Sequence, residues 1–409
     1  MLKRLYFFLS IFLIIGLVLG IGWFVRYRNS VSKNLENIPP ANNLPDLSGI
    51  NPRSGSSAST TPVKVSLPPQ KPFGPVADQE VIAYHPYSDG SIIIIQPGGQ
   101  IMKVVGNEGT VLSSLGISNL SHAAFSYDGK KIVALFGNPL NPQVSVFDTD
   151  RKSWEPVFAR PASPPLWSPH NYRLLFLTET EGLRTVTTVD MGATTPKTED
   201  LISLNAEDIV VAWKGMSEIF IGEKPSAFSS GQLLAYDIQK KTISTVLKDW
   251  PGLDFLWNLN PQEGVVLQSN KNAAGGKMSL VGGTGIIARQ FSFVSIPSKK
   301  CVFEKPAPKT PVTTSTTGTD LLEQPSRLLI CAVPQNANRF LGFFLPDDYF
   351  QKEIMTEDYI IQADLSTGNI KNISASVTDS FDGTFLKTTA EAVFFINRYN
   401  NKLYRLLRS

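Results

Sequence analysis

Histidine and cysteine are scarce in this chain of 409 residues, which has three histidines and two cysteines. A zinc site needs about four such side chains at ligand spacing, and the two cysteines have no histidine or acidic companion at that spacing. His85, His122 and His170 stand near the openings of the repeats described below, where a histidine more often caps or packs than catalyses. We therefore predict no metal site and no cofactor.

Motifs of common catalytic sites are also lacking. No Gly-x-Ser-x-Gly segment is present, so a serine hydrolase elbow has no support. The glycine-rich segments near residues 275 and 283 lack the Lys-Ser/Thr pair of a phosphate loop. Asp347 and Asp348 are adjacent carboxylates, but neighbours on a strand point to opposite faces, and such a pair more often decorates a loop. We predict no catalytic residue and a protein that is not an enzyme.

Charge is limited and unevenly placed. Residues 1–28 carry four basic side chains and no acidic one, which leaves 34 basic against 35 acidic residues in the rest of the chain. No basic stripe with interleaved aromatic residues is visible there. A nucleic-acid partner is therefore not expected.

One long apolar run stands near the N-terminus. The 21 residues from Leu5 to Val25 hold no charge, which is enough for a helix to cross a hydrocarbon core of about 30 Å. The alternative is a cleaved signal peptide, but its apolar run is usually about 7–15 residues and ends in a small-residue cleavage site, which is absent here. We predict a retained transmembrane anchor within residues 1–28.

The orientation of this anchor is not decided by charge, because Lys3 and Arg4 before it nearly balance the basic residues after it. The short N-terminal tail suits the cytoplasmic side, and the two cysteines favour an oxidising compartment for the rest. We predict a single-pass membrane protein with a cytoplasmic N-terminus and an extracytoplasmic body.

Proline, serine and threonine dominate residues 29–75. This composition cannot bury enough apolar surface to offset the cost of ordering the backbone. We predict a disordered linker that tethers the globular body. Residues 63–67 alternate like a strand and are expected to pair with the end of the chain if they are ordered.

The rest of the chain, residues 76–409, repeats. Residues 122–150 contain three apolar runs joined by tight turns, and related units recur at intervals near forty residues, the spacing of four-stranded propeller blades. Six units open on a strand that ends in an aromatic residue, with intervals of 41, 42, 46, 44 and 46 residues: Tyr84, Phe125, Trp167, Trp213, Trp257 and Phe303. The aromatic residues are predicted to pack between blades. The fold class is thus an all-β propeller of seven blades, with six or eight as alternatives.

The sixth and seventh units are irregular. The next comparable aromatic residue, Phe385, follows Phe303 by 82 residues, which two blades or one blade with insertions would explain. We favour insertions near residues 306–326 and 334–357. The seventh unit ends one strand short, so we expect residues 63–67 or 76–82 to complete it and close the ring.

The two cysteines, Cys301 and Cys331, fall on the first and second strands of the sixth unit. This placement would put them across two antiparallel strands, and we predict a disulfide. The alternative is a pair of buried free thiols.

The second insertion of the sixth unit is rich in aromatic residues. Aromatic side chains on an exposed loop are typical of recognition surfaces. The predicted partner-binding residues are Phe343, Phe344, Asp347, Asp348, Tyr349 and Phe350. The alternative is that these aromatic residues pack against the propeller as a satellite core.

Three segments resemble the WD40-like (PD40) repeats of the TolB-type bacterial propeller family: A-A-F-S-Y-D-G-K-K-I-V from Ala123, L-W-S-P-H from Leu166 and L-L-A-Y-D-I from Leu233. The resemblance implies a periplasmic or cell-surface propeller that acts through protein contacts without a cofactor. The span and linker depart from TolB itself, which has a removable signal and an α/β domain before its propeller. The segments around Cys301, Cys331 and Pro346 look more like membrane-anchored propellers of unassigned function.

These features together predict a non-enzymatic, monomeric propeller, tethered to the membrane, that binds a protein or an envelope polymer. The alternative is a propeller enzyme acting on glycans or peptides with carboxylates in its central channel. Converging carboxylates with a perturbed pKa would favour the enzyme, and an aromatic patch on the rim would favour the binding module.

Overall fold

The computed structural model describes residues 64–408, except for residues 68, 70, 181, 260, 261, 272 and 305–326. The predicted anchor within residues 1–28, most of the predicted linker and the first insertion lie outside the described residues. In the part of the chain that is described, no helix has both the length and the apolar character needed to cross a membrane.

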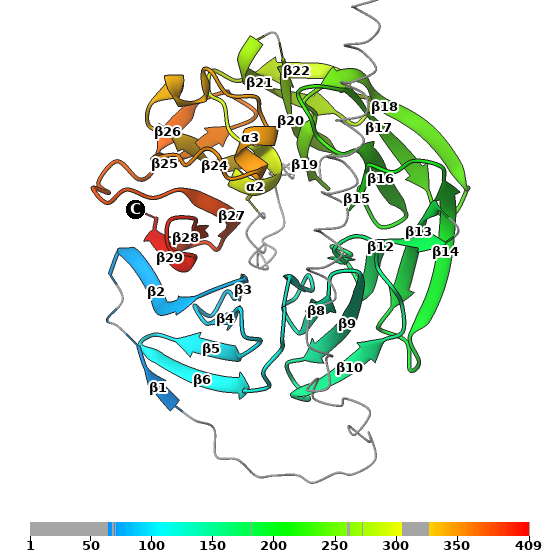
Figure 1. Cartoon of the computed structure of the whole chain (residues 1–409). Helices are drawn as coiled ribbons and strands as arrows, with labels where there is room; N and C mark the ends of the chain where they lie inside the picture. The colour runs from blue at the N-terminus through cyan, green and yellow to red at the C-terminus, as the bar shows by residue number, and fades with distance from the viewer. Residues whose placement is uncertain are drawn as a thin grey trace, which may run out of the picture. The chain divides into compact units, whose positions relative to one another are not determined.

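Seven antiparallel sheets surround a central axis (Figure 1). Each sheet is one blade, and in most blades the strands run from the axis outward in sequence order. The first three blades are β3 (Ala83–Pro86), β4 (Ile92–Ile95), β5 (Ile101–Val105) and β6 (Glu108–Ser113); β7 (His122–Phe125), β8 (Lys131–Asn138), β9 (Asn141–Asp148) and β10 (Ser153–Val157); and β11 (Leu166–Trp167), β12 (Arg173–Thr180), β13 (Leu183–Asp190) and β14 (Lys197–Leu204).

The next three blades follow the same order: β15 (Ile209–Trp213), β16 (Glu218–Glu223), β17 (Ser230–Asp237) and β18 (Thr242–Pro251); β19 (Asp254–Asn258), β20 (Glu263–Asn270), β21 (Ala273–Gly282) and β22 (Ile287–Gln290); and β23 (Cys301–Phe303), β24 (Leu328–Pro334), β25 (Asp358–Asp364) and β26 (Ile370–Asn372). The last blade contains β27 (Gly383–Thr388), β28 (Ala392–Asn397) and β29 (Lys402–Leu407). The prediction of seven blades is confirmed, and six and eight blades are wrong.

The aromatic residues at the blade openings lie on the innermost strands, as predicted. Tyr84, Phe125, Trp167 and Trp213 are buried in four of these strands. Each contributes to the apolar layer between neighbouring sheets. Trp257 and Phe303 are half-buried, and Phe385 on β27 is 48% exposed.

Short acidic turns join the third and fourth strands of several blades. The Oδ1 atom of Asp148 accepts hydrogen bonds from the backbone N–H groups of Asp150 and Arg151. Asp237 makes the same pair of contacts in the fourth blade. These repeated aspartates stabilise turns, as an Asx turn does.

The ring is closed by a strand from the N-terminal side. β2 (Phe73–Glu80) pairs antiparallel with β29 and completes the seventh blade, while β1 (Lys64–Ser66) pairs with β6 and extends the first blade to five strands (Figure 1). The closing strand overlaps the second predicted segment, residues 76–82. The expectation that residues 63–67 pair with the end of the chain is wrong, because their register lies along β6. Both strands use residues assigned to the linker from sequence.

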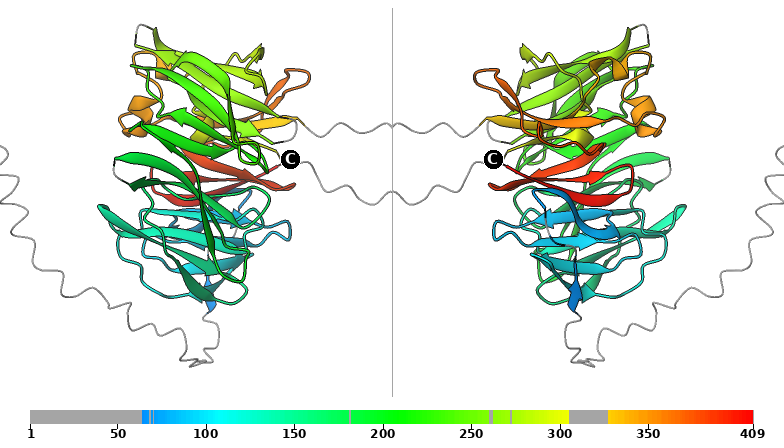
Figure 2. Two further views of the ribbon diagram at one scale, coloured as in Figure 1. Left: turned by 90° about the vertical axis from the view of Figure 1, so that its right-hand side faces the viewer. Right: turned by 90° about the vertical axis from the view of Figure 1, so that its left-hand side faces the viewer.

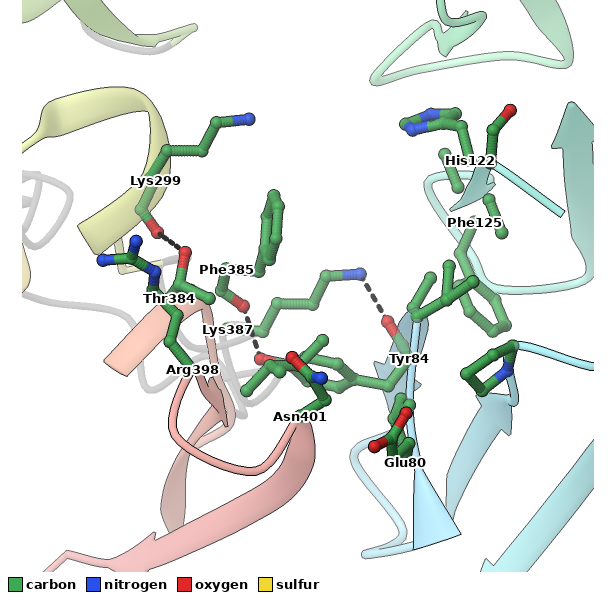
Figure 3. A pocket seen from close by; sticks show the side chains of 18 of the residues that line it. Glu80, Tyr84, His122, Phe125, Lys299, Thr384, Phe385, Lys387, Arg398 and Asn401 are labelled. Atoms are coloured by element: carbon green, nitrogen blue, oxygen red, sulfur yellow. Dashed lines mark hydrogen bonds between the residues drawn. The ribbon is translucent and has the colours of Figure 1, made fainter. Parts of the chain in front are cut away.

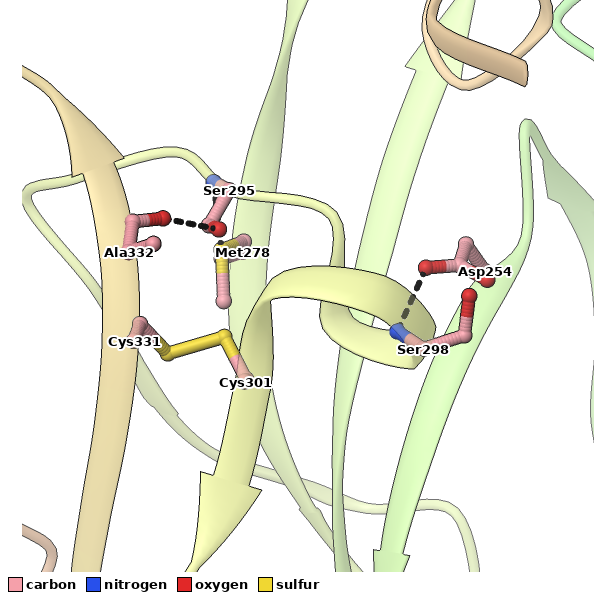
Figure 4. Close-up of a disulfide and its surroundings, with 7 residues drawn as sticks. All are labelled: Asp254, Met278, Ser295, Ser298, Cys301, Cys331 and Ala332. Atoms are coloured by element: carbon pink, nitrogen blue, oxygen red, sulfur yellow. Dashed lines mark hydrogen bonds between the residues drawn. A yellow bond between two sulfur atoms is a disulfide. The ribbon is translucent and has the colours of Figure 1, made fainter. Parts of the chain in front are cut away.

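The predicted disulfide is confirmed. Cys301 on β23 and Cys331 on β24 are directly opposed in the strand register, and their sulfur atoms are 2.08 Å apart (Figure 4). Both residues are buried in the apolar cluster of the fifth and sixth blades. The disulfide therefore joins the two strands that flank residues 305–326.

Candidate functional site

A cavity of about 640 Å³ opens at the central channel, where the seventh, first and second blades meet (Figure 3). We call it the axial pocket. Its walls come from the connection into β3, from β7, β27 and the β28–β29 turn, and from two short helices, α2 (Pro297–Lys300) and α3 (Asp347–Phe350). Its size lies within the range of small-molecule sites, about 300–1,000 Å³. Its polar and aromatic lining includes Glu80, Tyr84, His122, Lys299, Phe385, Lys387 and Arg398.

The charge of the pocket lining is predominantly positive. Among the described residues, four lining side chains are cationic and one is a carboxylate: Lys299, Lys352, Lys387 and Arg398 against Glu80. Cations gathered around a recess of low dielectric attract negatively charged ligands. The pocket is therefore an anion-attracting site.

Two of these cations are held in place by neighbouring groups. Lys387 Nζ donates to the Tyr84 carbonyl oxygen at 2.7 Å and lies 5.3 Å from the centre of the Tyr84 ring. Arg398 Nη1 donates to Asp382 Oδ2 at 2.8 Å. Both side chains are therefore held in the wall of the pocket, and Asp382 offsets the charge of Arg398.

Lys299 differs from them. Its Nζ atom lies 4.9 Å from the centre of the Phe385 ring, and within the described part of the chain it makes no hydrogen bond and no ion pair. Burial lowers its pKa, and the charge of Asp254 acts against that effect. Figure 3 shows the side chain extending into the pocket. Lys299 is thus a half-buried cation without a direct anionic partner among the described residues.

Asp254 lies behind Lys299 and carries its own constraint. Burial raises its pKa to about 6, against the lowering effect of hydrogen bonding by Ser298, whose backbone N–H donates to Asp254 Oδ2 at 2.9 Å (Figure 4). This bond ties β19 to α2. One carboxylate oxygen of Asp254 therefore accepts a hydrogen bond that holds α2, the helix that presents Lys299.

His122 faces Lys299 from the opposite wall (Figure 3). Burial lowers its pKa, a hydrogen bond to the Pro165 backbone raises it, and the charge of Lys299 lowers it. Its Nε2 atom is buried and has no hydrogen-bond partner among the described residues. The imidazole is therefore held largely neutral at the edge of the pocket.

Phe385 occupies a special backbone position. It lies in a bulge of β27, where the pairing with β28 is interrupted between Thr384 and Lys387, and its φ is +54°. A bulky residue in the left-handed region is strained, and such strain clusters at functional sites. The Tyr84 hydroxyl donates to the Phe385 and Phe394 carbonyl oxygens and supports the bulge. The bulge turns the Phe385 ring into the pocket.

A fully buried charge network lies beneath the pocket wall. Lys300 Nζ is 2.7 Å from Asp358 Oδ2, from Asp382 Oδ1 and from Thr356 Oγ1. Burial alone would lower the pKa of Lys300, but the two carboxylates raise it. Arg398 joins the network through Asp382. These carboxylates face Lys300 and Arg398, and none of them lines the axial pocket.

The predicted partner-binding loop, residues 334–357, folds over this network. Tyr349 is buried, and its ring lies 4.1 Å from the Arg398 guanidinium carbon and 5.3 Å from Lys300 Nζ. Phe343 packs against the apolar cluster of the fifth and sixth blades, which also contains Tyr349. Phe350 is half-buried and lines the axial pocket. Part of the loop is thus satellite core, and its end reaches the channel mouth.

The other predicted residues of this loop take structural contacts. Asp347 Oδ2 accepts from the Ala227 backbone N–H at 2.7 Å, and Asp348 Oδ2 accepts from the Phe344 N–H at 2.7 Å. The Phe344 ring lies 4.9 Å from that of Phe228, on the fourth blade. These contacts fix the loop on neighbouring blades, and its role in partner binding stays a prediction.

The sequence gives little warning of the axial pocket. Lys299 precedes the sixth opening strand without any motif, and His122 and Phe385 belong to repeated positions that usually serve packing. One difference is visible in the sequence: in the second unit Asp128 and Gly129 follow Phe125, whereas in the seventh unit Asp382 and Gly383 precede Phe385. The sequence shows this order of residues, but the exposure of the Phe385 ring depends on the bulge in β27.

No family model matches the sequence, and no curated protein matches it. The fold resembles an oligogalacturonate lyase in complex with manganese, with a TM-score of 0.56 and 9% identity over 86% of this chain and 98% of that one. It also resembles an uncharacterized protein of Listeria monocytogenes EGD-e, with a TM-score of 0.51 and 13% identity over 86% of this chain and 98% of that one. The chain is a seven-bladed β-propeller. At these identities the likeness shows the propeller fold alone.

The solved structures similar to this propeller include TolB from Acinetobacter baumannii, with a TM-score of 0.40 and 12% identity over 79% of this chain and 60% of that one.

Among the described residues of this propeller, no three His, Cys, Asp or Glu side chains gather as metal ligands would.

Proposed function

We propose that this propeller is a non-enzymatic binding module, tethered to a membrane by the apolar segment from Leu5 to Val25 and held on the extracytoplasmic side. It binds a protein or an envelope polymer on the face that carries the axial pocket and the loop of residues 334–357. We call this the loop face.

The observation that carries the proposal is the cationic axial pocket under a docked loop. Four cationic side chains line the pocket beside one carboxylate among the described residues. The loop adds exposed apolar surface, since Leu341 is 60% exposed and the nearby Phe228 is 57% exposed. A face with apolar side chains around a charged recess has the composition of a recognition surface.

A propeller enzyme with channel carboxylates is the alternative function, and enzymes such as the lyase share this fold. That mechanism needs carboxylates that converge on a substrate. The acidic side chains with raised pKa, Asp254 and Asp358, are fully buried and bonded to backbone or lysine. Glu80 is the carboxylate that reaches the pocket within the described chain. We therefore favour binding over catalysis.

Recovery of a partner by the full chain tests the proposal. A loop-face variant, Leu341→Asp with Lys352→Glu, changes two exposed side chains. The matched control, Ile243→Asp with Lys241→Glu, makes the same changes in the β17–β18 hairpin, at the opposite ends of the strands. We expect cross-linking in envelope fractions to recover one partner with wild type and control, and at least tenfold less with the loop-face variant. Equal recovery from all three would contradict the proposal.

A further inference from the structure

The axial pocket contains a charge that the protein itself does not neutralise. The Lys299 side chain is half-buried, its Nζ lies 4.9 Å from the centre of the Phe385 ring, and it has no hydrogen-bond acceptor among the described residues. An ammonium group that loses part of its hydration in a protein is normally compensated by a hydrogen bond to an acceptor. An exception of this kind points to a partner that arrives from outside.

The neighbouring charges cannot serve as that partner. Asp254 is separated from Lys299 beyond ion-pair distance and already accepts a bond from the Ser298 N–H at 2.9 Å. Asp382 is committed to Lys300 and Arg398. Glu80, the last residue of β2, is exposed. The Lys299 ammonium is therefore free to receive an anion.

The groups beside Lys299 select the shape of the ligand. The Phe385 ring is 48% exposed and stands between Lys299 and Lys387 in the pocket (Figure 3). Its positive φ holds it there at an energetic cost. Phe350 and Tyr84 add further aromatic lining. A ligand that fits this pocket therefore carries an apolar group next to its anionic group.

We propose that the axial pocket binds an organic carboxylate with an apolar body, the carboxylate at Lys299 Nζ and the apolar body against Phe385. The inference rests on the proposed function and names the ligand chemistry of the loop face. A carboxylate receives charge-assisted hydrogen bonds from an ammonium, and these are stronger than bonds between neutral groups. Lys387 also lies in the pocket wall, and Arg398 there is paired with Asp382.

Two sources share this chemistry: a free organic acid and the C-terminal residue of a peptide. N-acetylphenylalanine represents the first, and an acetylated hexapeptide ending in phenylalanine the second. Each is compared with its own C-terminal amide, which keeps the ring and removes the charge. Isothermal calorimetry or ligand-observed NMR on the full chain measures all four.

We expect at least one acid to bind ten or more times more tightly than its amide. Binding of the hexapeptide alone identifies a peptide end, and equal binding of both acids identifies the terminal carboxylate as sufficient. Lys299→Gln should reduce the affinity at least tenfold, while Lys130→Gln, at an exposed lysine in the β7–β8 hairpin, should leave it unchanged. Acid and amide binding alike, no binding by either acid, or unchanged affinity in Lys299→Gln would each overturn the inference.

Thermal unfolding separates a ligand site from a structural role. If Lys299 only balances Asp254, Lys299→Gln should lower the melting temperature, whereas a ligand site leaves it unchanged or higher, because a half-buried charge without an ion-pair partner has been removed. The outcome is also distinct from that of the partner test. Loss of acid binding with intact partner recovery leaves the loop-face function standing, while acid binding without any partner refutes that function and retains the site.

Discussion

At the scale of single residues, two ionisable groups near the axial pocket are held away from water. Burial raises the pKa of Asp254 and lowers that of Lys299, so for both residues the fold favours the neutral form. Each keeps its charge at a cost to the free energy of folding. Stability should therefore depend on pH through these residues.

Asp254→Asn tests this dependence. The folded-state pKa of about 6 is above the usual 3.8, so the cost of the ionised carboxylate is present above pH 6 and is relieved as the pH falls toward 4. We expect the variant to raise the free energy of unfolding at pH 8 by up to about 3 kcal/mol, with little change at pH 4. Urea denaturation at a series of pH values measures it.

The exposed Asp379 provides the control, because Asp379→Asn should leave the pH profile of the wild type unaltered. A wild-type pH dependence that persists in Asp254→Asn would show that other groups cause it.

Single residues are also where prediction from sequence ends. The blade-opening pattern correctly placed Phe385 on an inner strand, but the exposure of its ring depends on a bulge in β27. Lys299 becomes part of a site only because α2 lies across the channel from His122 (Figure 3). No local motif encodes either feature. The exposed Phe385 ring depends on the pairing of β27 with β28, and the position of α2 opposite His122 depends on the closed ring.

At the scale of elements, the hairpin of β23 and β24 is the one held by a covalent link. Cys301 and Cys331 are separated by 30 residues, and α2 leads directly into β23. The disulfide therefore fixes the strand that follows Lys299 and Lys300. It also limits the unfolded chain across residues 305–326.

Replacing both cysteines, Cys301→Ala with Cys331→Ala, should lower the free energy of unfolding by about 3–4 kcal/mol, the loop-closure value for this separation. Dithiothreitol should bring the wild type close to the double variant in chemical denaturation. It should not affect the double variant itself. Equal stability of oxidised and reduced wild type would contradict a stabilising role for the bond.

The loop of residues 334–357 shows what composition alone cannot decide. Its aromatic residues predicted a recognition surface, and packing as a satellite core was the alternative. Tyr349 is buried between the cationic groups of Arg398 and Lys300, whereas Phe350 reaches the pocket. The buried charge network selects which aromatic ring turns inward, and that network joins α2, β25 and the residues just before β27 and just after β28.

At the scale of the whole molecule, the ring depends on its seam. Phe73 on β2 lies 5.5 Å from Phe381, 6.3 Å from Phe395 and 5.7 Å from Tyr404, measured between ring centres. Phe73→Ala should lower the free energy of unfolding by about 2–4 kcal/mol, because it removes an aromatic ring from this cluster. Thermal or urea unfolding of the full chain measures the loss.

Phe158→Ala is the matched control, since this ring is 94% exposed and its loss should change stability by less than about 0.5 kcal/mol. Similar unfolding of both variants would mean that β2 does not hold the ring closed.

The periodic features were the predictable part of the whole fold. Aromatic spacing gave the blades, the incomplete seventh unit indicated closure from the other terminus, and strand register placed the cysteines. The sequence left two segments open as the closing strand, and only the strand pairing separates them: β1 pairs with β6, whereas β2 pairs with β29.

The strands nearest the N-terminus of the described chain are drawn in blue in the side views of the propeller (Figure 2). Their order along the chain, β1 before β2, has a mechanical consequence. Tension applied to the chain ahead of Lys64 first loads the three residue pairs between β1 and β6. The pairing of β2 with β29 bears load only after β1 has peeled away. We therefore expect the β1–β6 pairing to separate before force reaches the β2–β29 pairing that closes the ring.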